Sequence, residues 1–185
     1  MKRKASLAAM LAVCSFGVSS VPAVPVPEPQ DNLPPGPKAT RTVIVGTWAW
    51  NIEANRLGAS ERCDLSWTHQ TAVDRYLQPI NGAAIKVVPE PFEKINLNYL
   101  KTVEFAKDKI PASDNNNLLK PGTVLAVRTV NGSFAKLKVV RYYKLHDFDF
   151  PGSELLNEVW KKVVLQRPNQ DYYHIELEWV LYKPE

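Results

Sequence analysis

The stretch 122-GTVLAVRTVNGSFAKLKVVRYY-143 decides the fold class, because two runs of alternating apolar and polar residues flank an Asn-Gly pair. Leu125 and Val127 share one face of the first run, and the apolar residues of the second run also share a face. Alternation with a period of two is typical of strands with one side on a core. Asn131-Gly132 offers the positive φ that a tight turn needs. The stretch therefore predicts a β-hairpin.

A second alternating run, 173-YHIELEWVLY-182, repeats this pattern near the end of the chain. Its odd-numbered positions are aromatic or aliphatic, and its other face carries three polar residues that we expect to meet solvent: His174, Glu176 and Glu178. If this strand lies beside the hairpin, Lys136 and Lys138 would face the two glutamates. Each good cross-strand pair of this kind contributes about 0.2–1 kcal/mol.

Shorter strand signals surround these two runs. Residues 42–50 (TVIVGTWAW) are rich in β-branched and aromatic side chains and predict a strand with Ile44, Trp48 and Trp50 on one face. Further strands are predicted at 65–68, at 83–88 after an Asn-Gly turn, and at 102–105 after a helical turn. Residues 110–122 predict a polar loop, because asparagine side chains compete with regular backbone hydrogen bonds.

One helix interrupts the strand pattern. Ser153 is a good N-cap for residues 154–165, where one stripe has helical spacing and comprises Leu155, Leu156, Val159, Trp160, Val163 and Val164. We expect this amphipathic helix to close one mouth or edge of the sheet. The predicted fold is mainly β: a single antiparallel β-sandwich or partly open barrel with one amphipathic helix.

The first residues indicate export. Three basic residues at 2–4 precede an uncharged apolar run to Ser20, which is typical of a secretory signal peptide over residues 1–21. Cleavage near Ala23 is one possibility. Lipidation at Cys14 is another, because Leu11–Cys14 resembles a lipobox except for Val13. A proline-rich stretch, residues 22–39, predicts an extended linker, and residues 40–185 predict the β-rich domain. We therefore expect a secreted or periplasmic protein, lipid-anchored to the envelope if Cys14 is modified.

Charge and cysteine content narrow the partners. The chain has 23 basic and 19 acidic residues, and three of the basic ones lie in the predicted signal peptide. The nearly balanced remainder argues against nucleic-acid binding, which needs a basic surplus. No transmembrane span is expected after signal removal, so membrane contact depends on lipidation at Cys14. Cys63 is then either buried or paired with another chain, and burial is favoured.

The chain's three histidines, His69, His146 and His174, show no zinc-type spacing. The segment HDFDFPG gives a weak metal candidate from His146, Asp147 and Asp149, whose carboxylates suit a divalent cation. No catalytic signature such as G-x-S-x-G, a P-loop or H-E-x-x-H occurs, so an enzyme is the minority hypothesis. Its form would be a hydrolase with scattered acidic residues, Asp64 together with the two aspartates above.

Aromatic residues offer two interpretations. The first is a core and the girdle of a twisted sheet; the second is a flat apolar slot for a planar or sugar ligand. On the second interpretation the candidate ligand-binding residues are Trp48, Trp50, Trp67, His69, His146 and Tyr143.

The order of motifs resembles a known family of exported proteins. W-x-W at 48–50, DLSW at 64–67, INGA at 80–83, the hairpin at 122–140 and IELEWVLY at 175–182 occur in an order similar to that of HmuY-like haem-binding lipoproteins. The resemblance implies a mostly β fold, export or lipid anchoring, and a planar ligand. That family holds haem between paired histidines, and none of this chain's histidines matches those positions by motif.

These observations lead to one main hypothesis and two alternatives. The main hypothesis is an exported, non-enzymatic domain that binds a small ligand or an envelope protein, without a cofactor. The first alternative is a haem- or tetrapyrrole-binding envelope protein that uses His69 or His146. The second is the hydrolase with scattered acids.

Overall fold

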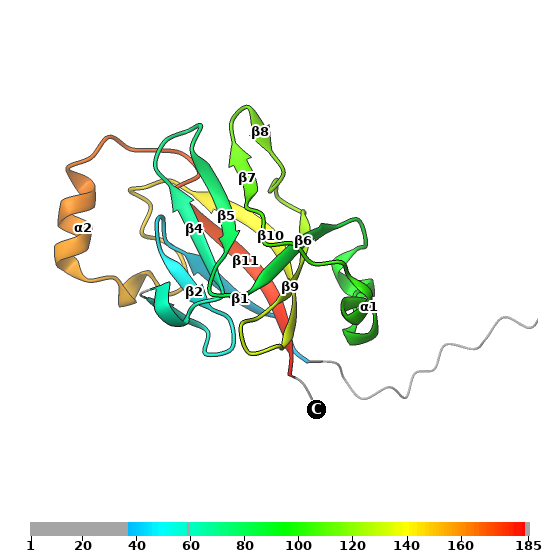
Figure 1. The fold of residues 1–185 in the computed structure, drawn as a ribbon. Coiled ribbons are helices and arrows are strands. Elements are labelled where there is room, and N and C mark those ends of the chain that lie inside the picture. The colour runs from blue at the N-terminus through cyan, green and yellow to red at the C-terminus, as the bar shows by residue number, and fades with distance from the viewer. Residues whose placement is uncertain (1–36, 59, 184–185) are drawn as a thin grey trace, which may run out of the picture. The chain divides into compact units, whose positions relative to one another are not determined.

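The computed structural model describes residues 37–58 and 60–183, which form two antiparallel sheets packed face to face (Figure 1). The expected mainly β sandwich is confirmed, and the described sheets do not close into a barrel. The predicted signal peptide, the lipobox and most of the linker lie outside the described residues. No helix in residues 37–58 and 60–183 is long and apolar enough to cross a membrane.

The first sheet has five strands in the order β1-β11-β10-β9-β6. Their bounds are β1 Thr40–Ile44, β6 Ala84–Val88, β9 Val124–Arg128, β10 Phe134–Tyr143 and β11 His174–Tyr182. The hairpin predicted from the alternating runs is β9–β10, and Gly132 takes a φ of +85° in its turn. The second alternating run is β11, which pairs with β10 as expected.

The second sheet has six strands in the order β3-β2-β4-β5-β7-β8. Their bounds are β2 Ala49–Asn51, β3 Arg56–Gly58, β4 Leu65–His69, β5 Arg75–Pro79, β7 Ile110–Ser113 and β8 Asn116–Asn117. The expectation of a polar loop at 110–122 was wrong in part, because a small hairpin, β7–β8, forms there. Its asparagines bond locally: the Ser113 hydroxyl accepts from the Asn116 amide, and Asn117 Oδ1 accepts from the Leu119 amide.

The stretch 42–50 is not one strand. It breaks at a turn in which the Trp48 amide donates to the Val45 carbonyl at 3.1 Å, with Thr47 at a φ of 64°. As a result β1 joins the first sheet and β2 joins the second. The chain crosses the sandwich here, and this crossover leaves β1 and β3 as the outermost strands on the same side.

The core lies between the two sheets. Inward side chains from both meet in one buried cluster, which includes Ile44, Trp50, Leu65, Trp67, Leu77, Leu125, Leu137, Ile175 and Leu177. Burial of this apolar area provides the main driving force for folding, at about 25 cal/mol per Å². Cys63 is buried, as the sequence favoured.

The outer face of the first sheet is covered at both ends. At one end lie the 3₁₀ turn η2 (Phe92–Lys94) and helix α1 (Leu97–Thr102), and at the other end lie η3 (Ser153–Leu155) and α2 (Glu158–Leu165) (Figure 1). A third 3₁₀ turn, η1, spans Ser60–Arg62. The expectation that His174 and Glu176 meet solvent was therefore wrong. They do lie on the outer face, but segments from elsewhere in the chain bury both.

Helix α2 begins later than predicted, at Glu158, because Asn157 rather than Ser153 caps it: the Asn157 side chain accepts from the Val159 amide at 2.7 Å. Within the helix only Trp160 and Val164 pack inward, and Leu156, just before the helix, packs on the same side. The neighbouring row remains exposed, with Val159 at 68%. Since the helix lies at the periphery, it buries one row rather than the whole predicted stripe.

The register of β10 and β11 corrects two further expectations. Lys138 faces Glu178 and pairs with it at 2.8 Å, as expected. Lys136 faces Val180 instead of Glu176, and its Nζ donates to the Phe92 and Ile95 carbonyls. A bulge at residue 140 places Arg141 opposite Glu176. The strand predicted at 102–105 is absent from the described residues, where Ala106 forms only an isolated bridge to Ile85.

Candidate functional site

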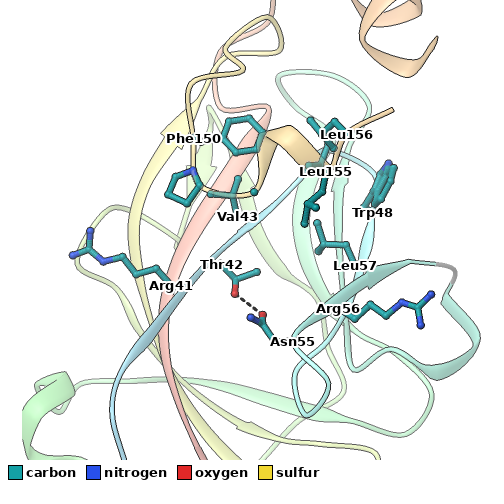
Figure 2. A pocket seen from close by; sticks show the side chains of 13 residues that line it. Arg41, Thr42, Val43, Trp48, Asn55, Arg56, Leu57, Phe150, Leu155 and Leu156 are labelled. Atoms are coloured by element: carbon teal, nitrogen blue, oxygen red, sulfur yellow. Dashed lines mark hydrogen bonds between the residues drawn. The ribbon is translucent and has the colours of Figure 1, made fainter. Parts of the chain in front are cut away.

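A groove runs along the open side of the sandwich, between the outermost strands β1 and β3 (Figure 2). Its volume is about 390 Å³, and segment 150–156 forms one wall. Most of its lining is apolar and comprises Val43, Trp48, Leu57, Phe150, Leu155 and Leu156. We call this the edge groove. Its size lies within the range of small-molecule sites.

The floor of the edge groove is a satisfied polar bridge between the sheets. The Thr42 hydroxyl donates to Asn55 Oδ1 at 2.6 Å, as Figure 2 shows. Two core tryptophans donate to the same pair: Trp50 Nε1 to Asn55 and Trp179 Nε1 to Thr42. Because buried indole N–H groups need partners, this bridge anchors the core. A bound molecule would therefore lie above it and contact the apolar walls.

Two arginines flank the groove, one on each bounding strand (Figure 2). The Arg41 guanidinium is half-exposed and lies 3.6 Å from the buried Glu176 carboxylate. Arg56 is exposed, and no carboxylate of the described chain forms an ion pair with it. An apolar slot with cationic flanks suits a ligand that has an apolar body and an acidic group.

The predicted tryptophans divide into two kinds. Trp48 is half-buried, lines the edge groove and meets the Trp160 ring edge-on at a centroid distance of 6.4 Å. Trp50 and Trp67 are fully buried in the core, and Trp67 Nε1 donates to the Tyr173 carbonyl at 2.8 Å. Trp48 is thus the predicted tryptophan that a groove ligand can touch.

The other predicted ligand residues lie elsewhere. The His69 Nε2 atom bonds the Asp171 carbonyl at 3.2 Å, and burial lowers the pKa of His69. The His146 ring contacts the Val164 carbonyl at 3.3 Å. The Tyr143 hydroxyl donates to Glu176 at 2.8 Å, and burial raises the pKa of Tyr143. None of these three side chains lines the edge groove.

The weak metal candidate and the scattered acids do not assemble. Asp147 Oδ2 accepts from the Lys144 amide in a local turn. The part of the chain that the structure describes holds no group of three or more potential metal-ligating His, Cys, Asp or Glu residues. Asp64 uses both carboxylate oxygens to accept the Ile52 and Val130 amides, each at 2.8 Å. Burial raises the pKa of Asp64 while those amides oppose the rise, so this carboxylate links two loops.

Sequence reasoning missed the most unusual polar groups. His174 is fully buried, its Nδ1 accepts from the Gly46 amide at 3.3 Å, and its Nε2 has no hydrogen-bond partner. Burial lowers the pKa of His174 to about 4, against a smaller opposing effect of the Leu145 backbone and Asp147. Gly46 accounts for the close packing, since an added Cβ would lie 2.3 Å from the Tyr173 ring. The glycine within 42–50 was the one available signal.

Comparisons with known proteins add little. No family model and no curated protein matches the chain. Among solved structures, apo PinO from Porphyromonas gingivitis aligns with 80% of this chain and 100% of its own, at 9% identity and a TM-score of 0.42. That likeness is distant and says nothing about a ligand.

Proposed function

We propose that this chain is an exported, non-catalytic binding domain, and that its edge groove holds a ligand with an apolar body and an acidic group. The observation that carries the proposal is the groove itself: apolar walls on the open side of the sandwich, with Arg41 and Arg56 at its flanks. Apolar walls supply affinity by excluding water, and a few charged groups orient the ligand. The predicted signal peptide supports export, after which the groove would meet ligands outside the cytoplasm.

Decanoate and decanol test the groove, because they share a chain length and differ in charge. We expect both to bind the purified domain, measured by calorimetry, and decanoate to bind more tightly. Arg56→Gln should weaken decanoate two- to fivefold, the range of an exposed charge interaction, and leave decanol unchanged. Leu155→Asp should weaken both ligands, because Leu155 is exposed and contributes to the wall rather than to the core.

Matched controls separate the groove from the general surface. Arg167→Gln removes an exposed arginine outside the groove, and Val163→Asp changes an exposed apolar residue on α2. Both controls should bind like the parent. Equal losses in the controls, or no binding of either ligand, would overturn the proposal. Export is tested separately by the mass of the protein from its own host: a chain that retains Met1 contradicts it.

A tetrapyrrole is a second candidate, because Trp48 and Phe150 beside two arginines suit a planar apolar ligand with carboxylates. No histidine of the described chain lines the groove, so His69 and His146 would not ligate a metal bound there. We expect haemin and metal-free protoporphyrin to bind equally, with the haemin Soret band unchanged in His69→Ala and His146→Ala. A shift of the bound haemin band in either variant would place the haemin outside the groove.

A further inference from the structure

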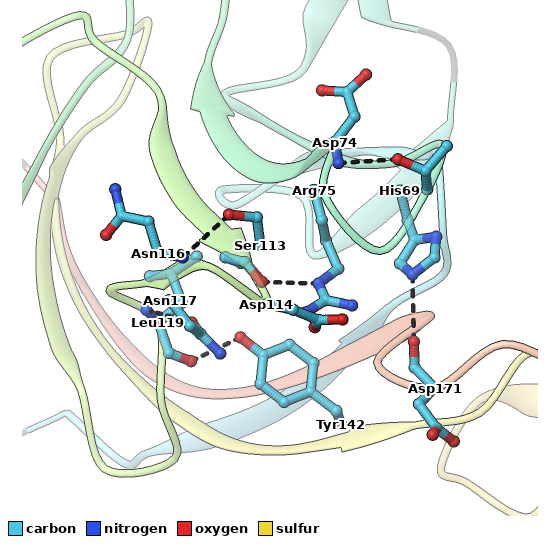
Figure 3. Close-up of polar contacts among 12 residues, drawn as sticks. His69, Asp74, Arg75, Ser113, Asp114, Asn116, Asn117, Leu119, Tyr142 and Asp171 are labelled. Atoms are coloured by element: carbon cyan, nitrogen blue, oxygen red, sulfur yellow. Dashed lines mark hydrogen bonds and ion pairs between the residues drawn. The ribbon is translucent and has the colours of Figure 1, made fainter.

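A second cavity, of about 360 Å³, lies at the end of the β4–β5 hairpin and differs from the edge groove in chemistry. Figure 3 shows part of its lining, with His69 and Asp171 on one side and Arg75 and Asp114 on the other. Its polar lining includes His69, Gln70, Arg75, Asp114, Gln170 and Tyr172. We call it the Tyr172 cavity. The proposed function assigns no role to this cavity.

Tyr172 is an exposed aromatic residue held in a strained backbone. Its φ is 58°, a left-handed conformation that bulky residues rarely adopt, and the residue is 41% exposed. The Arg75 guanidinium lies 4.7 Å from the ring centroid, and the Tyr142 ring lies 4.8 Å away. Strain of this kind, of order 1–3 kcal/mol, persists where surrounding structure enforces it and occurs often at ligand sites. The ring is therefore a preset platform at the cavity's rim.

The inner wall of the cavity consists of buried polar side chains that the protein holds in place. Arg75 is buried; its Nε donates to the Ala112 carbonyl and its Nη2 to Asp114, both at 2.7 Å (Figure 3). His69 is 97% buried, and its Nδ1 has no hydrogen-bond partner in the protein. The Nε2–carbonyl bond assigns the ring proton to Nε2, which leaves Nδ1 as an acceptor. An unsatisfied buried acceptor is costly, so the position of His69 is maintained by the packing around its ring.

The charges around the cavity cancel. Arg75 pairs with Asp114, and Asp171 pairs with Lys144 at 3.1 Å. Burial lowers the pKa of His69, which keeps the imidazole neutral at physiological pH. Two glutamine amides supply further donors and acceptors without charge. A site with balanced charge offers no net attraction to an anion or a cation, and its amide and imidazole groups suit a neutral ligand rich in hydroxyl groups.

We propose that the Tyr172 cavity binds a neutral saccharide. The C–H face of a sugar ring packs on the Tyr172 ring, and the planar amide and carboxylate groups exchange hydrogen bonds with the sugar hydroxyls. Arg75 acts as a positioning residue, because its bonds to Ala112 and Asp114 leave it under the Tyr172 ring.

A glycan array that carries neutral and acidic glycans tests this with the whole exported domain. We expect binding to a set of neutral glycans, at least tenfold weaker in Tyr172→Ala and severalfold weaker in Gln170→Ala. Tyr76→Ala is the matched control: Tyr76 is half-exposed and stacks on Lys109, outside the cavity. It should bind like the parent, as should Arg56→Gln in the edge groove.

Three results would overturn the saccharide site. These are no glycan bound at millimolar concentration in saturation-transfer NMR, binding that survives Tyr172→Ala, and binding restricted to sulfated or sialylated glycans that fades with salt. The last would indicate an anion site. Arg56→Gln keeps the two sites distinguishable, because loss of decanoate binding with intact glycan binding concerns the groove alone.

Discussion

The edge groove and the Tyr172 cavity are similar in size, about 390 and 360 Å³, yet opposite in chemistry. The groove lies at the edge of the sandwich, where the outermost strands β1 and β3 do not meet. Its apolar walls include Val43, Phe150 and Leu156 of the cluster that covers the outer face of the first sheet. The cavity is built by hairpin and loop residues with paired charges. The comparison shows that one sandwich core can support an apolar site at its open edge and a polar site at its loops.

Gly46 stands between the two regions and gives the largest expected effect. It follows Val45 of the groove and touches Tyr173, which lies against the His69 ring at a centroid distance of 4.9 Å. Gly46→Ala would place a Cβ 2.3 Å from the Tyr173 ring, so we expect a loss of about 3 kcal/mol in the free energy of unfolding, measured with urea.

Gly58→Ala is the matched control, because nothing lies within 4 Å of its added Cβ. It should change the free energy of unfolding by less than about 0.5 kcal/mol. If the two variants are equally stable, the close packing of Gly46 on Tyr173 does not limit stability. The packing that connects the groove with the cavity is then not rigid.

Acid should destabilise the region around His174, which packs between Phe150 and Tyr173. His174 contacts Phe150 of the groove at a centroid distance of 5.1 Å and has a pKa of about 4 in the folded state against 6.5 unfolded. The unfolded chain therefore takes up a proton first. This group's contribution is complete above pH 6.5 and is lost as the pH falls toward 4. Between pH 7 and 5 we expect a loss of about 2 kcal/mol.

His174→Gln keeps an acceptor for the Gly46 amide and removes the titration. This variant should lose about 2 kcal/mol less than the parent between pH 7 and 5, in urea unfolding at each pH. His146→Gln serves as the control and should follow the parent. Identical pH profiles for parent and His174→Gln would show that the buried imidazole is not a source of acid sensitivity.

The arginines of the two regions should differ in their effect on stability. Arg75 is buried, with charge-assisted bonds to Ala112 and Asp114, so Arg75→Met should cost about 1.5–3 kcal/mol. Arg56 is exposed at the groove, and Arg56→Gln should change stability by less than about 0.5 kcal/mol. Thermal unfolding of both variants checks the contrast, and equal losses would mean that Arg56 has a structural role.

Much of the fold could be predicted from the sequence, because local alternation encodes it. The β9–β10 hairpin, strand β11 and the Lys138–Glu178 pair follow from period-two patterns within single runs. The break at 45–48 and the bulge at 140 could not be predicted, since each depends on pairing between distant strands. The same limit explains His174, whose burial comes from α2 and the segments beside it rather than from its own strand.

The sites were harder to predict than the fold. Of the six predicted ligand residues, only Trp48 lines the edge groove, and His69 lines the Tyr172 cavity. Arg41 and Arg56 carried no signal, because exposed arginines are common on any surface. Tyr172 lies beside a strand pattern, and its positive φ depends on a loop conformation that composition does not reveal.

The smallest expected effect is that of ionic strength on ligand affinity, and it distinguishes the edge groove from the Tyr172 cavity most directly. Exposed charges are screened as the Debye length falls from about 10 Å at 0.1 M salt to about 3 Å at 1 M. Decanoate held by Arg56 should therefore bind two- to fourfold more weakly relative to decanol at 0.5 M NaCl than at 0.05 M, by calorimetry. Using decanol as the reference removes the general effect of salt on apolar burial, because that effect is the same for the alkyl tails of decanol and decanoate.

The saccharide site should respond differently, because its charges are already paired within the protein. Glycan affinity should change by less than about 1.5-fold over the same salt range, which NMR titration can resolve. Arg56→Gln should remove the salt dependence of decanoate and leave the glycan unaffected. If both ligands weaken equally with salt, the cavity attracts charge after all, and the chemical contrast between the two regions is lost.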